Sequence, residues 1–418
     1  MVPLVLIAVV NMLFCRDLTP SLAPFLFIST AFAGAWATNT QDYAIFFPLV
    51  PIVVGAFAFH FVLWPPKFQV GKMYYSLIGV SVALLLGGIG VTTAEEYFAG
   101  INLFFLIGLG PALILLYFIF LNTTVADENH DPAVTIPRIM CYFGLACAGV
   151  LALSIWPRFT GNWNWFFSWR NNLATFLLLC IPFPFYLAVK QKSLILSALQ
   201  FLLGCFFVAA TVLTLSRGGI IFGLVTAGLC FAYAVWKADG KRKRILFCAL
   251  TVAVIVAGLI VLLPNLRTRF GSGITSPDEA RYGLFRHAWE MFLAHPVFGR
   301  GLGYWGPLEY FSPNEDLTMY WYHNTVLQVL GSLGIVGAIA YIYQYINRAT
   351  TCLGRKPNNY SWCVFLSWGA FSMMAMVNAG DFMPVPDAII VVLLLTTAEL
   401  KNRQQCPRCE QLPSGVRL

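Results

Sequence analysis

The sequence predicts an all-α polytopic membrane protein, a single bundle of about 12 transmembrane helices. Of the 418 residues, 59% are hydrophobic and only 11% are charged, and the mean hydropathy is +0.74. Soluble domains carry roughly 25% charged residues, so a water-soluble globule of this length could not cover its surface with charge. The same composition excludes a disordered chain, a coiled coil and a disulfide-rich secreted scaffold.

Apolar segments separated by polar breaks supply the spans, because a helix needs about 20 apolar residues to cross a bilayer. We expect twelve of them, over residues 22–37, 43–64, 73–92, 100–121, 136–156, 172–189, 193–214, 218–237, 244–263, 322–347, 360–378 and 384–400. Residues 3–14 are apolar but too short to cross alone. They lack a basic start and a small-residue cleavage site, which argues against a cleaved signal peptide.

These spans divide the chain into four parts. Residues 1–263 form the N-terminal part of the transmembrane bundle, residues 264–322 a long loop, residues 323–400 the C-terminal spans, and residues 401–418 a polar tail. Long loops on rigid scaffolds tend to carry function. The loop of residues 264–322 is therefore the first place to look for chemistry.

Within that loop, residues 280–294 are predicted to form an amphipathic helix. Aromatic side chains recur at helical spacing on one stripe, formed by Tyr282, Phe285, Trp289 and Phe292. Polar side chains lie off that stripe, namely those of Arg286, His287 and Glu290. Such a helix would lie in the headgroup layer with its aromatic side chains toward the lipid. Pro296 and the glycines that follow it mark the end of the helix.

Lysine and arginine in the short loops predict the orientation, because cytoplasmic loops are enriched in both. The densest group is Lys237 with residues 241–244, which places that loop in the cytoplasm. Alternation from there puts every lysine on the cytoplasmic side. The cations left on the outer side are all arginines: Arg158, Arg170, Arg217, Arg267, Arg269, Arg281, Arg286 and Arg300.

An outer set made only of arginines indicates an anionic ligand on that side. The guanidinium group is planar and binds phosphate through two parallel hydrogen bonds. Ordinary ion pairs with the outer carboxylates Asp278, Glu279 and Glu290 are the alternative interpretation. The net charge of +8 follows the loops and forms no nucleic-acid-binding patch, so no nucleic acid is expected as a partner.

Metal and cofactor chemistry has little support in the sequence. Most of the eleven cysteines lie in apolar segments, and the lone C-x-x-C of Cys406 and Cys409 lies in the polar tail. No D-x-D motif occurs, and the ligand-rich segment 127–131 falls on the predicted cytoplasmic side. We therefore expect a protein without a cofactor or a bound metal.

His323 is the histidine best placed for chemistry, at the mouth of a span, where its intrinsic pKa lies near neutrality. An interfacial histidine can equally be structural. Arg170, Asn171 and Asn172 lie at another outer span entrance, where they could contact a sugar or a headgroup.

Three elements, in this order along the chain, resemble the bacterial O-antigen ligase family, whose members include the lipid A core–O-antigen ligases. The run from Ser216 to Gly219 is similar to the family's S-R-G-G element. The segment from Arg281 to Gly301 resembles its arginine-led loop helix and the Pro/Gly turn after it. The run from His323-Asn324 through Gly334 to Gly337 is similar to the pattern H-[NSQ]-x9-G-x-x-G.

This resemblance implies a GT-C-type glycosyltransferase in the bacterial inner membrane, with its active site and its long loop facing the periplasm. The family transfers O-antigen polysaccharide from undecaprenyl pyrophosphate to a sugar hydroxyl of the lipid A core, which yields lipopolysaccharide. The implied partners are this lipid-linked donor, the lipid A core acceptor and the surrounding membrane lipids.

The resemblance also suggests a role for each site residue. His323 is the expected base, with Asn324 orienting it or the sugar. Arg217 and Arg281 would stabilise the departing pyrophosphate, with Arg286 as the next candidate. Residues with supporting roles are Arg170, Asn172, Gly334 and Gly337, although the two glycines could instead serve close helix packing. The loop offers no evident carboxylate nucleophile, so inversion at the anomeric carbon is expected.

Two other functions remain open at this point. O-antigen polymerases and protein O-oligosaccharyltransferases use the same lipid-linked donor with a different acceptor. A polysaccharide transporter or flippase would bury ionisable groups near the middle of the membrane. The predicted span centres are almost free of such groups, with His60 as the main exception. Polar chemistry is concentrated at one face, which favours an enzyme over a transporter, and the His323-Asn324 motif favours the ligase over the polymerases.

Overall fold

The computed structural model describes residues 2–17, 49–65, 68–98, 106–124, 131–160, 170–270, 276–302, 305–307, 317–319, 322–354, 357–378, 382 and 385–404. The predicted span 22–37, residues 127–130 of the acidic segment and the pair Cys406/Cys409 lie outside these residues. So do the side chains of Arg158, Arg267 and Arg269.

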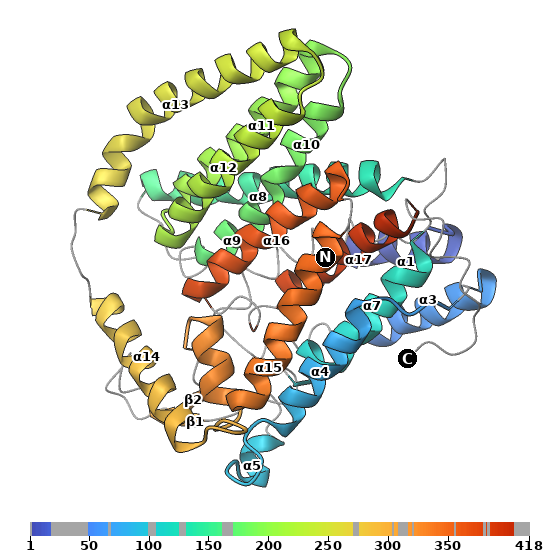
Figure 1. The fold of residues 1–418 in the computed structure, drawn as a ribbon, viewed down its shortest axis with the longest axis vertical. Coiled ribbons are helices and arrows are strands. Elements are labelled where there is room, and N and C mark those ends of the chain that lie inside the picture. Colours follow the sequence, from blue (N-terminus) through green and yellow to red (C-terminus); the bar gives the residue numbers. More distant parts are fainter. Residues whose placement is uncertain are drawn as a thin grey trace.

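The described residues form a bundle of helices with one short β-hairpin (Figure 1). The helices are α1 (Val2–Phe14), α3 (Leu49–Leu63), α4 (Met73–Leu86), α5 (Ala94–Tyr97), α7 (Pro111–Thr123), α8 (Pro132–Thr160), α9 (Arg170–Cys180), α10 (Pro182–Lys190), α11 (Leu194–Leu213), α12 (Arg217–Lys237), α13 (Lys241–Phe270), α14 (Ser276–Ala294), α15 (Thr325–Leu353), α16 (Asn359–Asn378) and α17 (Val385–Gln404).

The hairpin is the one departure from the predicted all-α fold within the described chain. Strands β1 (Trp305–Pro307) and β2 (Leu317–Met319) pair antiparallel, with Gly306 opposite Thr318. Both lie in the long loop between α14 and α15. Three-residue strands give no alternating apolar pattern, so the sequence carries no signal for them.

Eight helices within the described residues are long and apolar enough to cross a membrane. They coincide with predicted spans between residues 100 and 378, so the chain is a multi-pass membrane protein. Shorter apolar helices occupy Val5–Phe14, Pro51–Leu63 and Met73–Leu86. Helix α17 lies where the last span is predicted. A total of twelve crossings stays a prediction.

The centre of the bundle is the segment formed by α9 and α10, in which nearly every residue is buried. It packs against α8, α11, α12 and α16. Aromatic rings fill this region: Phe185 meets Phe201 edge-on at 5.0 Å, and Phe201 stacks on Phe247 at 5.0 Å. Gly204 permits this approach, because a Cβ there would come within 2.4 Å of the Phe185 ring.

A second group of helices is assembled around α15. It packs along α4, which lies beside it in Figure 1, and also against α14, α16 and α17. Among the described helices, α15 is the one that makes extensive contacts with α14.

At one end of the bundle, hydrogen bonds and ion pairs connect several helices and loops. The Nζ atom of Lys243 donates to the backbone oxygens of Val189 and Gln191, and Lys401 pairs with Asp131 at 3.0 Å. The carboxylate of Glu399 accepts hydrogen bonds from the Lys72 backbone N–H and from the Tyr117 hydroxyl, both at 2.7 Å. The sequence predicted that these segments lie at the cytoplasmic side of the membrane, apart from the part of α7 that carries Tyr117. The structure brings them together at one end of the bundle.

Helix α15 contains a sharp break at Gly334, whose φ of 63° and ψ of −154° lie in a region essentially reserved for glycine. The turn after α14 pairs the backbone groups that the break releases. The N–H groups of Arg300 and Gly301 donate to the carbonyls of Gly331 and Ser332, both at 2.9 Å. In return, the N–H of Ile335 donates to the carbonyl of Pro296 at 2.8 Å.

Gly334 therefore does not serve the close packing of two helices, which was the alternative interpretation of the sequence. A Cβ at this position would lie 2.5 Å from the carbonyl oxygen of Val297, in the turn after α14. Gly337 follows one turn later, and a Cβ there would meet Leu333 of its own helix at 2.2 Å. Gly334 therefore allows α15 to pack directly against the turn of residues 296–301.

The same turn is also attached to the end of α4. The N–H of Gly88 donates to the carbonyl of Phe298 at 2.9 Å, and the Thr92 hydroxyl donates to the carbonyl of Arg300 at 2.8 Å. The turn is thus bonded on one side to α15 and on the other to the segment that follows α4.

We expect Gly334→Ala to destabilise the protein by about 1–3 kcal/mol from backbone strain alone, and by more if the overlap with the turn is not relieved. Thermal unfolding of the purified protein in detergent would measure this. Gly369→Ala is the matched control, because Gly369 lies in α16 with no atom near its missing Cβ. Equal unfolding temperatures for the two variants would contradict the close packing of Gly334 against the turn of residues 296–301.

Candidate active site

Helices α12 and α15 begin in the same way: a residue with positive φ is followed by a side chain that caps the helix. Leu215 (φ 58°) precedes Ser216, whose Oγ accepts a hydrogen bond from the Gly219 N–H at 3.2 Å. His323 (φ 50°) precedes Asn324, whose Oδ1 accepts from the Leu327 N–H at 3.0 Å. Within the described residues these are the two non-glycine residues with positive φ. Such strain persists where the surroundings fix it, often at functional sites.

The segment around His323 is fixed from several sides. The backbone N–H of Tyr322 donates to Oε1 of Gln328 at 2.9 Å, and Nε2 of Gln328 donates to the Ser332 hydroxyl at 3.0 Å. The Tyr322 side chain is only 2% exposed and packs with Leu284 and Ala288 of α14. Because these contacts hold both neighbours of His323, the strained backbone there is retained.

A chain of polar side chains connects the starts of α12 and α15. The Ser216 hydroxyl donates to Oδ1 of Asn171 at 2.7 Å, at the start of α9. The adjacent Asn172 accepts a hydrogen bond through Oδ1 from Nδ2 of Asn378 at 3.3 Å, at the end of α16. Asn378 is in turn hydrogen-bonded to the His323 side chain. We name these five residues the polar cluster.

A second contact secures the end of α16 to the same segment. The Nδ2 atom of Asn324 donates to the backbone oxygen of Met376 at 2.8 Å, while its Oδ1 caps α15. Gly218 lies close to Met374 and Val377, so α12 also closes onto the end of α16. The polar cluster is therefore assembled by α9, α12, α15 and α16 together.

The His323 imidazole is neutral at pH 7. Burial lowers its pKa first, and the nearby positive charge of Arg281 lowers it further, whereas the hydrogen bond to Asn378 raises it. The resulting pKa is about 4. A neutral imidazole keeps one nitrogen lone pair, so it is able to accept a proton.

The predicted arginines differ in their placement. Arg217 is the first residue of α12 and Arg170 the first of α9, and Arg281 lies close enough to lower the pKa of His323. Arg286, by contrast, is 82% exposed and pairs with Glu290 at 2.8 Å. For Arg286 the structure thus shows the ion pair that was the alternative to phosphate binding, and does not bring it to the polar cluster.

A comparison with known protein families found a match. Residues 201–342 match the model of the O-antigen ligase family. The matched residues make up about a third of the chain, so the chain is similar to this family over that segment. No curated protein matches the chain.

The O-antigen ligase match begins within α11 and ends within α15. It includes Arg217, Arg281, His323 and Asn324. It does not include α9 and α16, which supply Asn172 and Asn378. The polar cluster therefore joins residues from inside and outside the matched segment.

Asn378 and Gln328 were not among the predicted site residues. Asn378 is the last residue of a predicted span, on the same predicted side of the membrane as Arg217 and His323. Its position among span-end polar residues is the one signal that could have identified it. Gln328 lies inside the helical segment and resembles any polar residue of a span.

Helix α14 is present where the sequence predicts an amphipathic helix, and the face that it buries lies off the predicted aromatic stripe. Leu284 and Ala288 pack against α15 and Tyr322. Tyr282 and Trp289 lie on the opposite, exposed side. This leaves the aromatic side chains available to a lipid headgroup layer, while Arg281 reaches His323.

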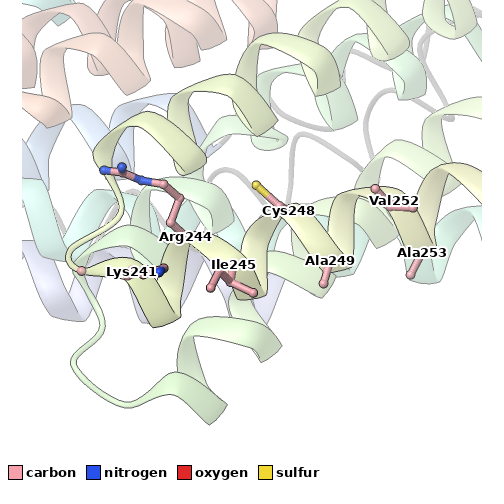
Figure 2. Close-up of a pocket in the computed structure, with 8 residues that line it drawn as sticks. Lys241, Arg244, Ile245, Cys248, Ala249, Val252 and Ala253 are labelled. Carbon is pink, nitrogen blue, oxygen red and sulfur yellow. The ribbon is translucent and has the colours of Figure 1, made fainter.

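No group of three or more His, Cys, Asp or Glu residues within the described part of the chain could hold a metal ion. A hollow of about 1200 Å³ exists elsewhere, along α13, between Gly240 and Ala253 (Figure 2). Its walls are apolar apart from Lys241 and Arg244. It lies at the opposite end of α12 from Arg217, so it is not the candidate site.

The lowered pKa of His323 should make stability depend on pH. The unfolded chain binds a proton at the ordinary pKa of 6.5, whereas the folded protein does so near 4. Between these values the unfolded state binds more protons, so the free energy of unfolding decreases as the pH falls from 6.5 to 4.

We therefore expect the unfolding temperature of the wild type to fall more steeply over this range than that of His323→Asn. Asparagine does not titrate and tolerates a positive φ. Parallel slopes for the two proteins would show that His323 does not have the lowered pKa.

Proposed function

We propose that this protein is a glycosyltransferase that moves O-antigen polysaccharide from undecaprenyl pyrophosphate to a sugar hydroxyl of the lipid A core. The observation that carries the proposal is the neutral, half-buried His323 near Arg281, in a polar cluster that also contains Ser216, the residue before Arg217 at the start of α12. The site would face the periplasm from the bacterial inner membrane.

His323 is the proposed general base. A sugar hydroxyl has a pKa far above 7, so a base must remove its proton as the oxygen attacks. A diphosphate bound at Arg281 would offset the positive charge that lowers the pKa of His323. Donor binding would thereby raise the basicity of the imidazole at the moment it is needed.

Arg217 and Arg281 are proposed to bind the diphosphate. Arg217 stands at the first turn of α12, where the helix dipole and backbone N–H groups favour an anion. The bond between the anomeric carbon and the diphosphate oxygen breaks with its electron pair, and the polyprenyl diphosphate departs as an anion. Two guanidinium groups would stabilise that charge without a metal ion.

Direct displacement accounts for every atom of this step. The acceptor oxygen forms a bond to the anomeric carbon on the face opposite the diphosphate, and its proton passes to His323. The anomeric configuration would therefore invert. Asn324, which caps α15 and holds the end of α16, would keep the histidine in place, and Arg170 would add positive charge at the start of α9.

The site's position suits substrates that are both anchored in lipid. The exposed Tyr282 and Trp289 of α14 would lie in the headgroup layer, at the level of the diphosphate and of the lipid A core. A polymerase would join the same donor to a second lipid-linked glycan, and the superfamily includes such enzymes. The acceptor used in the assay below distinguishes the two.

Replacement of the base is the first test. His323→Ala should lower transfer by about 10²–10⁴-fold, because the hydroxyl would lose its proton acceptor. His323→Asn, which suits the positive φ, should be equally impaired. The assay would combine purified protein, lipid-linked glycan and either lipid A core or a second lipid-linked glycan, with EDTA present in a parallel series.

A folded His323→Asn variant with near wild-type transfer would remove His323 as the base. Product formed only with the second lipid-linked glycan would favour a polymerase. Glycan crossing the membrane without a new glycosidic bond would favour a transporter. Loss of transfer in EDTA would contradict the metal-independent mechanism.

Arg217→Lys tests the phosphate-binding role. A lysine keeps the charge but cannot form two parallel hydrogen bonds to phosphate. Loss of one charge-assisted hydrogen bond of about 1.5–3 kcal/mol would lower kcat/KM for the donor by about 10–100-fold. Arg242→Lys, an exposed substitution at the other end of the bundle, is the control. Equal donor use by both variants would reduce the role of Arg217 to simple electrostatics.

A further inference from the structure

The proposed mechanism assigns no role to the hydrogen bond between Asn378 and Asn172. Both side chains are buried, with 9% and 8% of their surface exposed, at an end of the bundle that would otherwise be apolar packing between α9 and α16. Burying a side-chain amide is unfavourable unless its hydrogen bonds are made. The pair is therefore retained for its partners, of which His323 is one.

The polarity of the amide decides what Asn378 can do for the imidazole. Its Nδ2 atom is directed to Oδ1 of Asn172 at 3.3 Å, which fixes the two ends of the amide group. Oδ1 is then the end that remains for His323, and an oxygen can only accept. The imidazole nitrogen that faces Asn378 must carry the proton.

We propose that Asn378, oriented by Asn172, is a positioning residue that holds neutral His323 in one tautomer and leaves the lone pair of the other nitrogen for the acceptor hydroxyl. This inference rests on the proposed role of His323 as the base. It adds two residues outside the family match to the residues on which the reaction depends.

A neutral amide suits this position better than a carboxylate. A carboxylate would also orient the imidazole, but it would add negative charge beside Arg281, where the donor's diphosphate is proposed to bind. Asparagine orients the ring without repelling that anion. This explains why an amide supports the base here, where many histidine bases are supported by Asp.

On the elements around the polar cluster, α14 carries Arg281, His287 and the exposed Arg286–Glu290 pair, α12 begins with Arg217 and α9 begins with Arg170. Of these groups, Arg281 is the one whose charge acts on the pKa of His323. Residues 370–378, at the end of α16, contain no ionisable group. A carboxylate introduced at position 378 would therefore be a new negative charge next to the imidazole.

The test is the pH profile of transfer by the full-length protein with lipid-linked glycan and lipid A core. Asn378→Ala should lower kcat at least about tenfold, with little change in KM for the donor, because the tautomer is no longer fixed. Asn378→Asp should retain part of the activity and move the acid limb of the kcat profile to higher pH, since a carboxylate favours the imidazolium.

Asn172→Ala removes the orienting partner and leaves Asn378 in place. It should lower kcat less than Asn378→Ala does. The double variant should be no worse than Asn378→Ala alone, because both residues act through one chain. If Asn378→Ala does not fold, the Asn172→Ala and Asn378→Asp variants still provide the comparison.

Asn358→Ala is the matched control. Nδ2 of Asn358 donates to Oδ1 of Asn402 at 2.9 Å, so it breaks a similar pair of amides at the other end of the bundle. Its kcat and pH profile should match the wild type.

Two results would overturn the inference. One is a wild-type pH profile for Asn378→Asp together with wild-type kcat for Asn172→Ala. The other is a loss in Asn378→Ala that only follows its loss of folded protein. If His323→Asn is inactive in the same assay, such results reject the role of Asn378 alone, whereas an active His323→Asn rejects the proposed function itself.

Discussion

The rest of the structure depends on the repair of one interrupted helix. In an apolar surrounding every backbone N–H and C=O group needs a partner, so a break in α15 is stable only if another segment supplies them. The turn of residues 296–301 does so, through Arg300, Gly301 and Pro296. Because that turn ends α14, the repair also fixes where α14 lies. The same backbone pairing therefore helps to place Arg281, on α14, near His323.

The two ends of the bundle use polar groups differently. At the end that contains Glu399 and Lys401, formal charges pair with each other and with backbone groups. At the end that contains His323, the connecting side chains are neutral amides and hydroxyls, and the charges nearby are arginines. The arrangement therefore separates the residues that build the site from those that would bind the diphosphate.

The sequence predicted the spans well because the bilayer imposes a length and a composition on each of them. It also located α14, since helical spacing is a local signal. The break at Gly334 depends on a turn more than thirty residues earlier, so no local pattern could show it. The register of α14 against α15 was likewise not local, and Arg286 consequently was assigned to the site although it pairs with Glu290. The partnership of Asn172 with Asn378 joins residues 206 positions apart.

The left-handed backbone at position 323 restricts which side chains could ever replace the histidine. Only a few residue types adopt that conformation readily, and asparagine, aspartate and histidine are the ones most enriched there. Of these three, histidine alone combines a neutral form at pH 7 with a basic nitrogen. Glutamate and lysine, which serve as proton acceptors in other enzymes, would be disfavoured by the chain conformation before their chemistry was ever tested. The choice of base in this scaffold is thus constrained by main-chain geometry as much as by acidity, and any redesign for a different nucleophile would have to begin by rebuilding the start of α15.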